Sequence, residues 1–249
     1  MSRLANKTAL ITGGTTGIGF ATAQAFLAAG ARVAITGQNA ARVTAAVKAL
    51  GAGAIGIQAD QGSIADLDKC AARVKAEFGA LDVLFVNAGI VKPATLADIT
   101  PEHVAEHLNV NFTGALFTIQ RMLPLLKNPA SVILTSTTFT EKGVPGLSVY
   151  SASKAAIRSL ARSFSAELLP RGIRVNVISP GPIETPIFGK LGLPPEALDA
   201  MAGQMLGMVP MGRFGKPEEI ARAALFLASE DSAYMAGQEI VIDGGMAAL

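Results

Sequence analysis

Short apolar runs alternate with helical patterns from one end of the chain to the other. Several runs are nearly continuous in apolar residues, which is typical of parallel strands buried on both faces of a sheet. The predicted strands are Thr8–Thr12, Arg32–Thr36, Ala54–Ala59, Asp82–Val86, Ser131–Thr135, Ile173–Ile178 and Glu239–Ile242. Segments with helical spacing lie between them, such as Gly17–Ala29, Ala40–Leu50 and Ile64–Phe78. This alternation predicts right-handed crossovers and a doubly wound α/β sheet.

The length of 249 residues suits one α/β domain with a large core, so we expect a single domain over residues 1–249. One region, from Pro180 to about Gly215, is rich in Gly, Pro and Met, and we expect it to be irregular because it interrupts the alternation. In this architecture ligands bind at the carboxyl ends of the strands. We therefore expect a lid over the site, formed by residues of about 186–213.

Composition and charge narrow the class of protein. Half of the residues are apolar, which excludes a disordered chain, and the net charge of +2 gives no reason to expect a nucleic-acid partner. No apolar run reaches the roughly 20 residues that span a bilayer. The N-terminal residues contain no signal-peptide core. We expect a cytoplasmic protein that binds neither nucleic acid nor membrane.

The cysteine and the histidines are not expected to form a site. One Cys and two His predict neither a disulfide nor a zinc site, and no other metal site is expected. Cys70 lies in a predicted helix, where a buried, inert thiol is the expected state. Thr100 and Pro101 resemble an N-cap followed by the first helical residue. In the helix that they begin, we expect His103 and His107 to pack at the surface or an interface.

A glycine-rich turn, from Thr12 to Gly19, follows the first predicted strand and opens the first predicted helix. Gly13, Gly17 and Gly19 can adopt positive φ angles and let the main chain approach a pyrophosphate. The helix N-terminus adds N–H groups and partial positive charge. Three glycines could also serve a tight turn alone, but the flanking strand and helix favour a dinucleotide site.

Tyr150 and Lys154 stand four residues apart, so in a helix they share one face. A free tyrosine has a pKa of about 10. A nearby ammonium favours the phenolate, so we expect the pKa of Tyr150 to be lowered. The phenol could then give a proton to a ketone or, as phenolate, take one from an alcohol. A surface pair without chemistry is the alternative; the glycine turn and Asn111 argue against it.

Several motifs together resemble those of the short-chain dehydrogenase/reductase family. They are Thr12-Gly13…Gly17-x-Gly19, Asn87-Ala88-Gly89, Asn111, Tyr150-x-x-x-Lys154, Pro180-Gly181 and Asp243-Gly244-Gly245, in the family's order. The resemblance implies a Rossmann-type sheet of seven parallel strands. It also implies an NAD(P)-dependent oxidoreductase acting on CH–OH groups, and usually a homotetramer.

The resemblance implies catalytic roles for two further residues. One is a hydroxyl that holds the substrate oxygen in line with the phenol; its position is Thr137, where the family usually has Ser. Thr keeps the hydroxyl, but its methyl restricts χ1 and takes up space, so we favour a working substitute over reduced or altered activity. Ser136, its neighbour, is expected to point elsewhere. Asn111 is expected to bend its helix and hold a water that relays protons to Lys154; an Asn bonded to its own backbone is the alternative.

The resemblance also implies contacts with the cofactor. Asn87-Ala88-Gly89 would pack against the adenosine ribose, Asp60 would meet the adenine amine, and the main chain of Ile183 would read the nicotinamide carboxamide. The expected cofactor-binding residues are Gly13, Thr15, Thr16, Gly17, Ile18, Gly19, Gln38, Asn39, Asp60, Gln61, Asn87, Ala88, Gly89, Tyr150, Lys154, Pro180, Gly181, Ile183 and Thr185.

The end of the second strand favours NADP(H) over NAD(H). NAD-binding relatives carry an acidic residue there, and this chain has Gly37, which would not repel a 2′-phosphate. The Arg that NADP-binding relatives often have next is Gln38 here, and Thr16 in the glycine turn is not basic. Arg42 could reach the phosphate; a solvated charge on a helix is an equal alternative.

The apolar segment from Phe188 to Met211 favours a hydrophobic ketone or secondary alcohol as substrate. Its flexible thioethers suit an adaptable pocket, although packing in the core or a subunit interface is an equal alternative. We expect Val144, Phe188 and Met205 to contact the substrate. A dehydrogenase of a polar sugar or hydroxy acid, and a catalytically weak dinucleotide-binding sensor or scaffold on the same fold, stay open.

Overall fold

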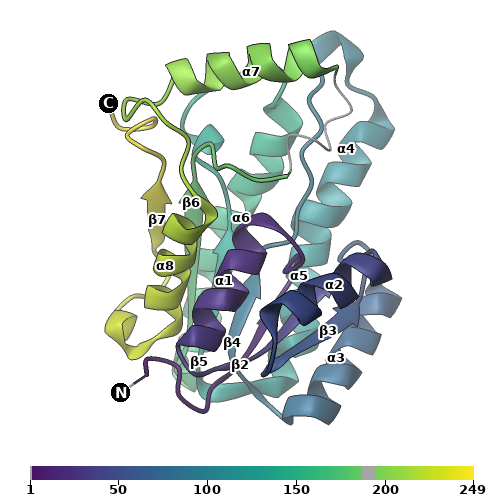
Figure 1. Ribbon diagram of the computed structural model, residues 1–249, viewed down its shortest axis with the longest axis vertical. Helices are drawn as coiled ribbons and strands as arrows, with labels where there is room; N and C mark the ends of the chain where they lie inside the picture. Colours follow the sequence, from purple (N-terminus) through teal and green to yellow (C-terminus); the bar gives the residue numbers. More distant parts are fainter. Residues whose placement is uncertain (1, 187–193) are drawn as a thin grey trace.

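Seven parallel strands form one sheet in the computed structural model, which describes residues 2–186 and 194–249 (Figure 1). The strands are β1 (Thr8–Ile11), β2 (Arg32–Gly37), β3 (Ala54–Gln58), β4 (Leu81–Val86), β5 (Leu126–Thr135), β6 (Ile173–Pro180) and β7 (Glu239–Ile242). Their order across the sheet is β3-β2-β1-β4-β5-β6-β7. The predicted doubly wound α/β fold is confirmed.

Helices cover both faces of this sheet (Figure 1). One face packs against α1 (Gly17–Ala28), α2 (Ala40–Leu50) and α8 (Pro217–Ala228); the other packs against α3 (Ile64–Phe78), α5 (Gly114–Met122) and α6 (Ser148–Leu168). Successive strand residues point to opposite faces. Leu10 and Leu84 therefore lie in the core under α3, α5 and α6, whereas Ile11 and Phe85 lie in the core under α1, α2 and α8. Burial on both faces explains why the strands are nearly continuous apolar runs.

Shorter helical segments complete the chain. A helix of two turns, α4 (Pro101–Leu108), passes through a π-helical segment, η2 (Asn109–Thr113), into α5. As predicted, the Thr100 side chain caps α4 by accepting a hydrogen bond from the His103 N–H. The 3-10 turns are η1 (Leu96–Asp98), η3 (Leu123–Leu125), η4 (Thr138–Thr140), η5 (Leu169–Arg171) and η7 (Glu230–Ser232).

The strand order reverses between β1 and β4. The chain runs from β1 outward to β3 and then returns to place β4 on the other side of β1. Such a reversal opens a crevice beyond the carboxyl ends of the strands. The glycine turn follows β1 and Asn87 follows β4, so both predicted motifs lie at this crevice.

The region between Pro180 and Gly215 is more regular than the sequence predicts. It contains a helix, α7 (Pro195–Gly207), which Figure 1 shows lying across the top of the molecule, beyond the carboxyl ends of the strands. Pro at the start of the helix and Glu196 in its first turn both favour a helix N-terminus. Gly203 and Gly207 obscured this helix in the sequence, and the prediction of an irregular region is wrong here.

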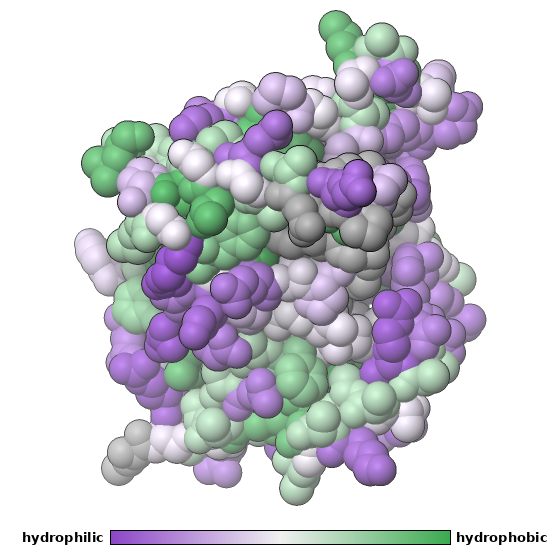
Figure 2. Space-filling view, turned by 45° about the horizontal axis from the view of Figure 1, so that its top comes forward, coloured by the Kyte–Doolittle hydropathy of each residue, from purple (hydrophilic) through white to green (hydrophobic). Residues whose placement is uncertain are grey.

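The outer surface carries both hydrophobic and hydrophilic residues, and neither kind covers the whole face drawn in Figure 2. None of the helices within residues 2–186 and 194–249 combines the length and the apolar character that a bilayer crossing requires.

Candidate active site

The glycine turn links β1 to α1, and its glycines serve two different purposes. Gly13 and Gly17 have φ angles of 65° and 56°, which residues with a Cβ rarely adopt. Gly19 lies inside α1 and does not have a positive φ, so the prediction of one is wrong. A Cβ there would lie 2.4 Å from the main-chain oxygen of Gly13, so the glycine lets the helix pack directly against the turn. The main-chain N–H groups at the start of α1 are consequently available to an anion.

Hydrogen bonds hold the glycine turn against the loop after β4. The Thr12 Oγ1 accepts hydrogen bonds from the N–H groups of Asn87 and Ala88, both at 3.0 Å. The Asn87 Nδ2 donates back to the main-chain oxygens of Thr12, at 3.1 Å, and Gly13, at 3.4 Å. The two motifs therefore form one rigid wall of the crevice.

A cleft of about 670 Å³ opens between this wall and the start of α6. Most residues of the predicted site line it: Gly13, Thr15, Thr16, Gly17, Ile18, Gln38, Asn39, Asp60, Gln61, Asn87, Ala88, Gly89, Thr137, Tyr150, Lys154, Pro180, Gly181, Ile183, Thr185 and Met205. Gly19 and Asn111 lie behind the surface of the cleft, and Val144 is not among its lining residues. Phe188 lies outside the described residues.

Three of the predicted cofactor residues also hold the protein's own main chain. The Asn39 side chain caps α2 by accepting a hydrogen bond from the Arg42 N–H at 2.9 Å. Asp60 accepts one from the Gly62 N–H at 2.8 Å. The Gln61 Nε2 donates to the main-chain oxygens of Ala88, at 2.9 Å, and Val110, at 3.0 Å. The first two bonds shape their own loops, and those of Gln61 hold the loop after β3 against the loop after β4 and against η2.

The cleft also contains residues that the sequence did not reveal. They include Ile90, Val91, Lys92, Glu106, Phe139 and Leu147. Ile90, Val91 and Lys92 follow directly after Asn87-Ala88-Gly89, so their position in the sequence was a usable signal. Leu147, the N-cap residue of α6, is buried and lines the cleft. Its spacing from Tyr150 does not show which way it faces.

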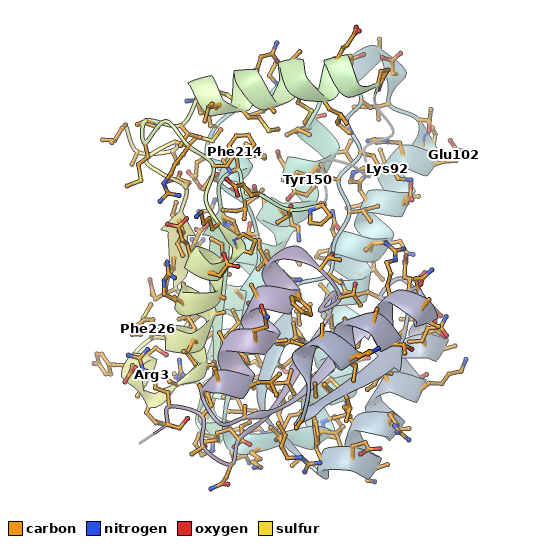
Figure 3. The ribbon with its side chains drawn as sticks, in the orientation of Figure 1. Arg3, Lys92, Glu102, Tyr150, Phe214 and Phe226 are labelled. Carbon is orange, nitrogen blue, oxygen red and sulfur yellow. The ribbon has the colours of Figure 1, made fainter. Side chains whose placement is uncertain are left out.

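Tyr150 and Lys154 lie one turn apart at the start of α6, as predicted. Figure 3 shows Tyr150 on the side of the molecule that α7 covers. The Lys154 ammonium donates a hydrogen bond to the Thr135 main-chain oxygen at 2.9 Å. Burial lowers the pKa of Lys154 to about 8. Burial also raises the pKa of Tyr150 to about 12, against the opposite effect of a hydrogen bond with Thr137. The prediction of a lowered tyrosine pKa is therefore wrong: loss of solvation is the largest effect on this phenol.

Thr137 brings its hydroxyl to the phenol of Tyr150. The same Oγ1 lies 3.5 Å from the main-chain oxygen of Pro180, on β6. Ser136 points the other way, as predicted, and its hydroxyl donates to the Lys154 main-chain oxygen at 2.9 Å. The hydroxyl beside the phenol is thus that of Thr137.

Asn111 lies in the π-helical segment η2, between α4 and α5. A π-turn widens the helix and frees main-chain groups, which agrees with the predicted local distortion. The Asn111 Oδ1 accepts a hydrogen bond from the Ile90 N–H at 2.8 Å, and its Nδ2 donates to the Ile90 oxygen and to Ser153 Oγ, both at 3.0 Å. A Cβ added to Gly89 would lie 3.0 Å from Asn111 Oδ1 and 3.1 Å from Lys154 Nζ, so the absence of a side chain at Gly89 leaves room for both polar groups beside its main chain.

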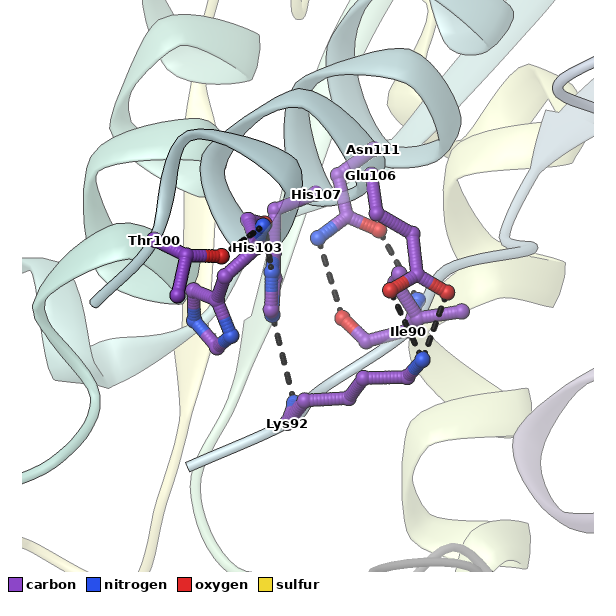
Figure 4. A network of polar contacts seen from close by, with 7 residues as sticks. All are labelled: Ile90, Lys92, Thr100, His103, Glu106, His107 and Asn111. Atoms are coloured by element: carbon purple, nitrogen blue, oxygen red, sulfur yellow. Dashed lines mark hydrogen bonds and ion pairs between the residues drawn. The ribbon is translucent and has the colours of Figure 1, made fainter. Parts of the chain in front are cut away.

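A second polar network, drawn in Figure 4, holds the loop after Gly89 to α4. The His107 Nε2 accepts a hydrogen bond from the Lys92 N–H at 3.2 Å, and its Nδ1 lies 2.9 Å from the His103 oxygen, which requires a proton on Nδ1. The Lys92 ammonium contacts both carboxylate oxygens of Glu106, at 2.6 and 2.7 Å. Burial lowers the pKa of His107, which favours this neutral form. His107 is fully buried and structural, so the prediction that it packs at the surface or an interface is wrong.

The sheet order, the glycine turn at the reversal point and the lining of the cleft define a dinucleotide-binding α/β protein of the doubly wound class. A family model described as enoyl-(acyl carrier protein) reductase matches residues 13–247. The chain belongs to the short-chain dehydrogenase/reductase family of NAD(P)-dependent oxidoreductases, which act on CH–OH and carbonyl groups.

Similar proteins cover the whole chain. An oxidoreductase of Sarocladium schorii, asL5, is 44% identical over 99% of this chain and 98% of its own. The 3-oxoacyl-[acyl-carrier-protein] reductase FabG of Thermotoga maritima is 36% identical over 98% of this chain and 99% of its own. A short chain dehydrogenase from Burkholderia cenocepacia in complex with NADP superposes with a TM-score of 0.90 at 33% identity, covering 99% of this chain and 100% of that one.

Proposed function

We propose that this protein reduces hydrophobic ketones with NADPH and oxidises the corresponding secondary alcohols in reverse. The observation that supports this most is the meeting of Tyr150, Lys154 and Thr137 at the end of a cleft whose opposite wall is the glycine turn. Proton donor, hydroxyl and anion-binding main chain thus line one cavity. A protein that binds NADPH in this cleft and turns over no carbonyl would be a sensor, which is the alternative function.

The glycine turn fits a dinucleotide. Gly13 and Gly17 leave main chain exposed at the N-terminus of α1, and Asn87 holds the neighbouring wall in place. The candidate cofactor residues at the other end, Pro180, Gly181 and Ile183, follow β6 and line the same cleft. NAD(P)H held by these residues would supply the hydride that reduces the carbonyl carbon.

Tyr150 is proposed as the proton donor to the ketone oxygen. Its raised pKa, about 12, keeps the phenol protonated near neutral pH, which suits the direction of reduction. Thr137 is proposed to hold the same oxygen with its hydroxyl, since it already bonds the phenol. Lys154, whose ammonium lies close to Gly89, is proposed to position the cofactor, and Asn111 is proposed to hold a water that passes protons to Lys154.

The apolar wall of the cleft supports a hydrophobic substrate. Phe139 and Leu147 line it near Tyr150 in the chain, and Met201 and Met205 reach it from α7. Met205 is buried, so α7 is packed onto the molecule through this side chain. We propose that α7, within residues 186–213, is the lid of the substrate site, and that its thioethers adapt to apolar groups.

NADP(H) is the proposed cofactor. Gly37 ends β2 without a carboxylate that would repel a 2′-phosphate, and Arg42 lines the cleft one turn into α2. A Cβ at Gly37 would lie 2.7 Å from the Thr15 Cγ2, so an acidic side chain there would displace Thr15. We expect a lower Michaelis constant for NADPH than for NADH.

A homotetramer is the proposed assembly. β7 lies at the edge of the sheet, where Val241 is exposed, and Tyr234 nearby in the chain is fully exposed. Exposed apolar side chains at a sheet edge suit contact with another copy of the chain.

The proposed function predicts that the protein oxidises NADPH in the presence of hydrophobic ketones, and that Tyr150→Phe strongly lowers the rate of this oxidation. Loss of a general acid typically costs 100- to 10,000-fold in rate, so we expect a fall in kcat of about 1,000-fold. The panel should hold aryl ketones, 3-oxoacyl esters and polar keto sugars, and the consumption of NADPH is followed by absorbance.

Cofactor binding provides the control for this experiment. Tyr150→Phe should bind NADPH with nearly the wild-type Kd, because the change removes a single hydroxyl. Tight NADPH binding by the wild-type protein without turnover of any carbonyl would favour the sensor. Faster turnover of the keto sugars would favour the polar substrate.

A further inference from the structure

Arg158 joins three segments of the chain close to the proposed catalytic centre. It lies on α6, one turn after Lys154, and its side chain is 23% exposed. The guanidinium donates to Thr140 Oγ1 at 3.0 Å and pairs with the Glu141 carboxylate, both at the end of η4. It also pairs with Glu239 Oε2, on β7, at 2.6 Å. A planar guanidinium can hold several such partners at once because its donors form a rigid fork.

The first set of contacts leads directly to Thr137. The Thr140 hydroxyl donates to the main-chain oxygen of Thr137 at 2.9 Å, and the Thr140 N–H does so at 3.3 Å. Arg158 therefore fixes Thr140, which in turn holds the main chain of Thr137 by two hydrogen bonds. The orientation of the Thr137 hydroxyl depends on this main chain, because χ1 of a β-branched residue is restricted.

The contact with Glu239 leads to the other side of the same hydroxyl. The Ser179 hydroxyl donates to Glu239 Oε1 at 2.5 Å, and Ser179 immediately precedes Pro180. The Pro180 oxygen accepts hydrogen bonds from the hydroxyls of Thr137, at 3.5 Å, and Thr138, at 3.3 Å. One guanidinium thus holds both the main chain of Thr137 and the strand that bears its acceptor.

We propose that Arg158 is a positioning residue that sets the Thr137 hydroxyl against the Tyr150 phenol. The proposal rests on the proposed function, in which this hydroxyl and this phenol share the substrate oxygen. It assigns to Arg158 an effect on the chemical step and none on the glycine turn, which lies on the opposite side of the cleft.

A double-mutant cycle between Arg158 and Thr137 tests the proposal through activity. Arg158→Leu should lower kcat about 10-fold and Thr137→Ala about 100-fold, and the double variant should be no worse than Thr137→Ala because the two residues act in one chain. The NADPH Kd should change much less than kcat in all three, because the glycine turn that would bind the pyrophosphate is left intact. Arg162→Leu is the matched control, since Arg162 is exposed on the same helix one turn later. Losses that multiply in the double variant would overturn the proposal.

A spectroscopic measurement tests it without turnover. The chain has two tyrosines and no tryptophan, so Tyr234→Phe leaves Tyr150 as the one tyrosine. With ¹³Cζ-labelled tyrosine, Arg158→Leu and Thr137→Ala should move the Tyr150 resonance in the same direction, and Arg162→Leu should leave it in place. An unmoved resonance in Arg158→Leu would refute the positioning role even if no ketone were turned over.

Two further variants separate a loss of positioning from a general loss of folding. Thr140→Val removes the hydroxyl between Arg158 and Thr137 and leaves both ion pairs, so it should reproduce the shift of the resonance and a loss in kcat. Arg158→Lys keeps the charge without the fork and should restore part of the kcat lost in Arg158→Leu. If Thr140→Val leaves the resonance and kcat unchanged, the proposed path from Arg158 to Thr137 is wrong.

Discussion

The two walls of the cleft are built by different means. On the glycine-turn side, residues 12–19 and 87–89, close packing of the main chain at Gly13 and Gly19 shapes the wall, and the side chains of Thr12 and Asn87 bond to main-chain groups. On the hydroxyl side, residues 135–141, 150–158 and 179–180, side chains shape it, through contacts such as those of Arg158 with Glu141 and Glu239. The first wall depends on where side chains are absent, and the second on which side chains are present.

Gly19→Ala disrupts the packing of the glycine-turn wall and should have the largest effect on NADPH affinity. The added Cβ would lie 2.4 Å from the Gly13 oxygen, so the turn must move away from α1. Overpacking of this kind costs about 2 kcal/mol, which corresponds to a loss of roughly 30-fold in NADPH affinity if it falls on the binding geometry. Calorimetry of NADPH binding and thermal unfolding measure the two effects.

Gly203→Ala is the matched control, because a Cβ at this helical position meets no atom of residues 2–186 or 194–249 within 4 Å. There the change should raise stability slightly, since alanine is the better helix former. If Gly19→Ala bound NADPH like wild type, the glycine-turn wall would tolerate an added side chain. The claim that this wall depends on the absence of side chains would then be wrong.

The same contrast explains how much the sequence could predict. Gly13, Gly17 and Asn87 were found because absence of a side chain and fixed spacing leave a local pattern after each strand. The raised pKa of Tyr150 was not, because it depends on the loss of solvent around the phenol, which spacing in the sequence does not show. The role of His107 likewise depends on contact with Lys92, which no spacing within α4 reveals.

The fold followed from the sequence for a related reason. Strands buried on both faces must be apolar throughout, so β1, β4 and β6 were recognisable without knowledge of their neighbours. α7 was missed because its glycines and methionines resemble a loop, and its burial of Met205 depends on the cleft beneath it. Arg158 had no sequence signal at all: its partner Glu239 comes from β7, at the far end of the chain.

The pH dependence of kcat/KM for NADPH tests the role of Lys154, which lies between the two walls of the cleft. Its pKa is lowered by burial to about 8, so the ammonium is charged below that pH and loses its proton above it. If the charge helps to hold the cofactor, kcat/KM for NADPH should be level below pH 8 and fall up to tenfold per pH unit above it. Initial rates between pH 6 and about 10 measure this profile.

Lys154→Arg is the control for this titration, because an arginine stays charged throughout the range. The variant should be less active, since the fork does not fit the place of the ammonium, but its profile should be flat above pH 8. A profile that falls in the same way in both proteins would assign the titration to another group.

Arg42→Gln should have the smallest effect and concerns the outer edge of the glycine-turn wall. Arg42 is exposed, so its pairing with a 2′-phosphate is screened by solvent and is worth about 1 kcal/mol, or roughly fivefold in the Michaelis constant for NADPH. The constant for NADH, which lacks this phosphate, should not change. Lys48 is an exposed cation at the other end of α2, and Lys48→Gln should alter neither constant.

Equal losses with both cofactors would mean that Arg42 supports α2 and does not bind the 2′-phosphate. Preference for NADPH would then come only from Gly37, where no carboxylate repels the 2′-phosphate. The glycine-turn wall would in that case discriminate between the two cofactors through the side chain that it lacks.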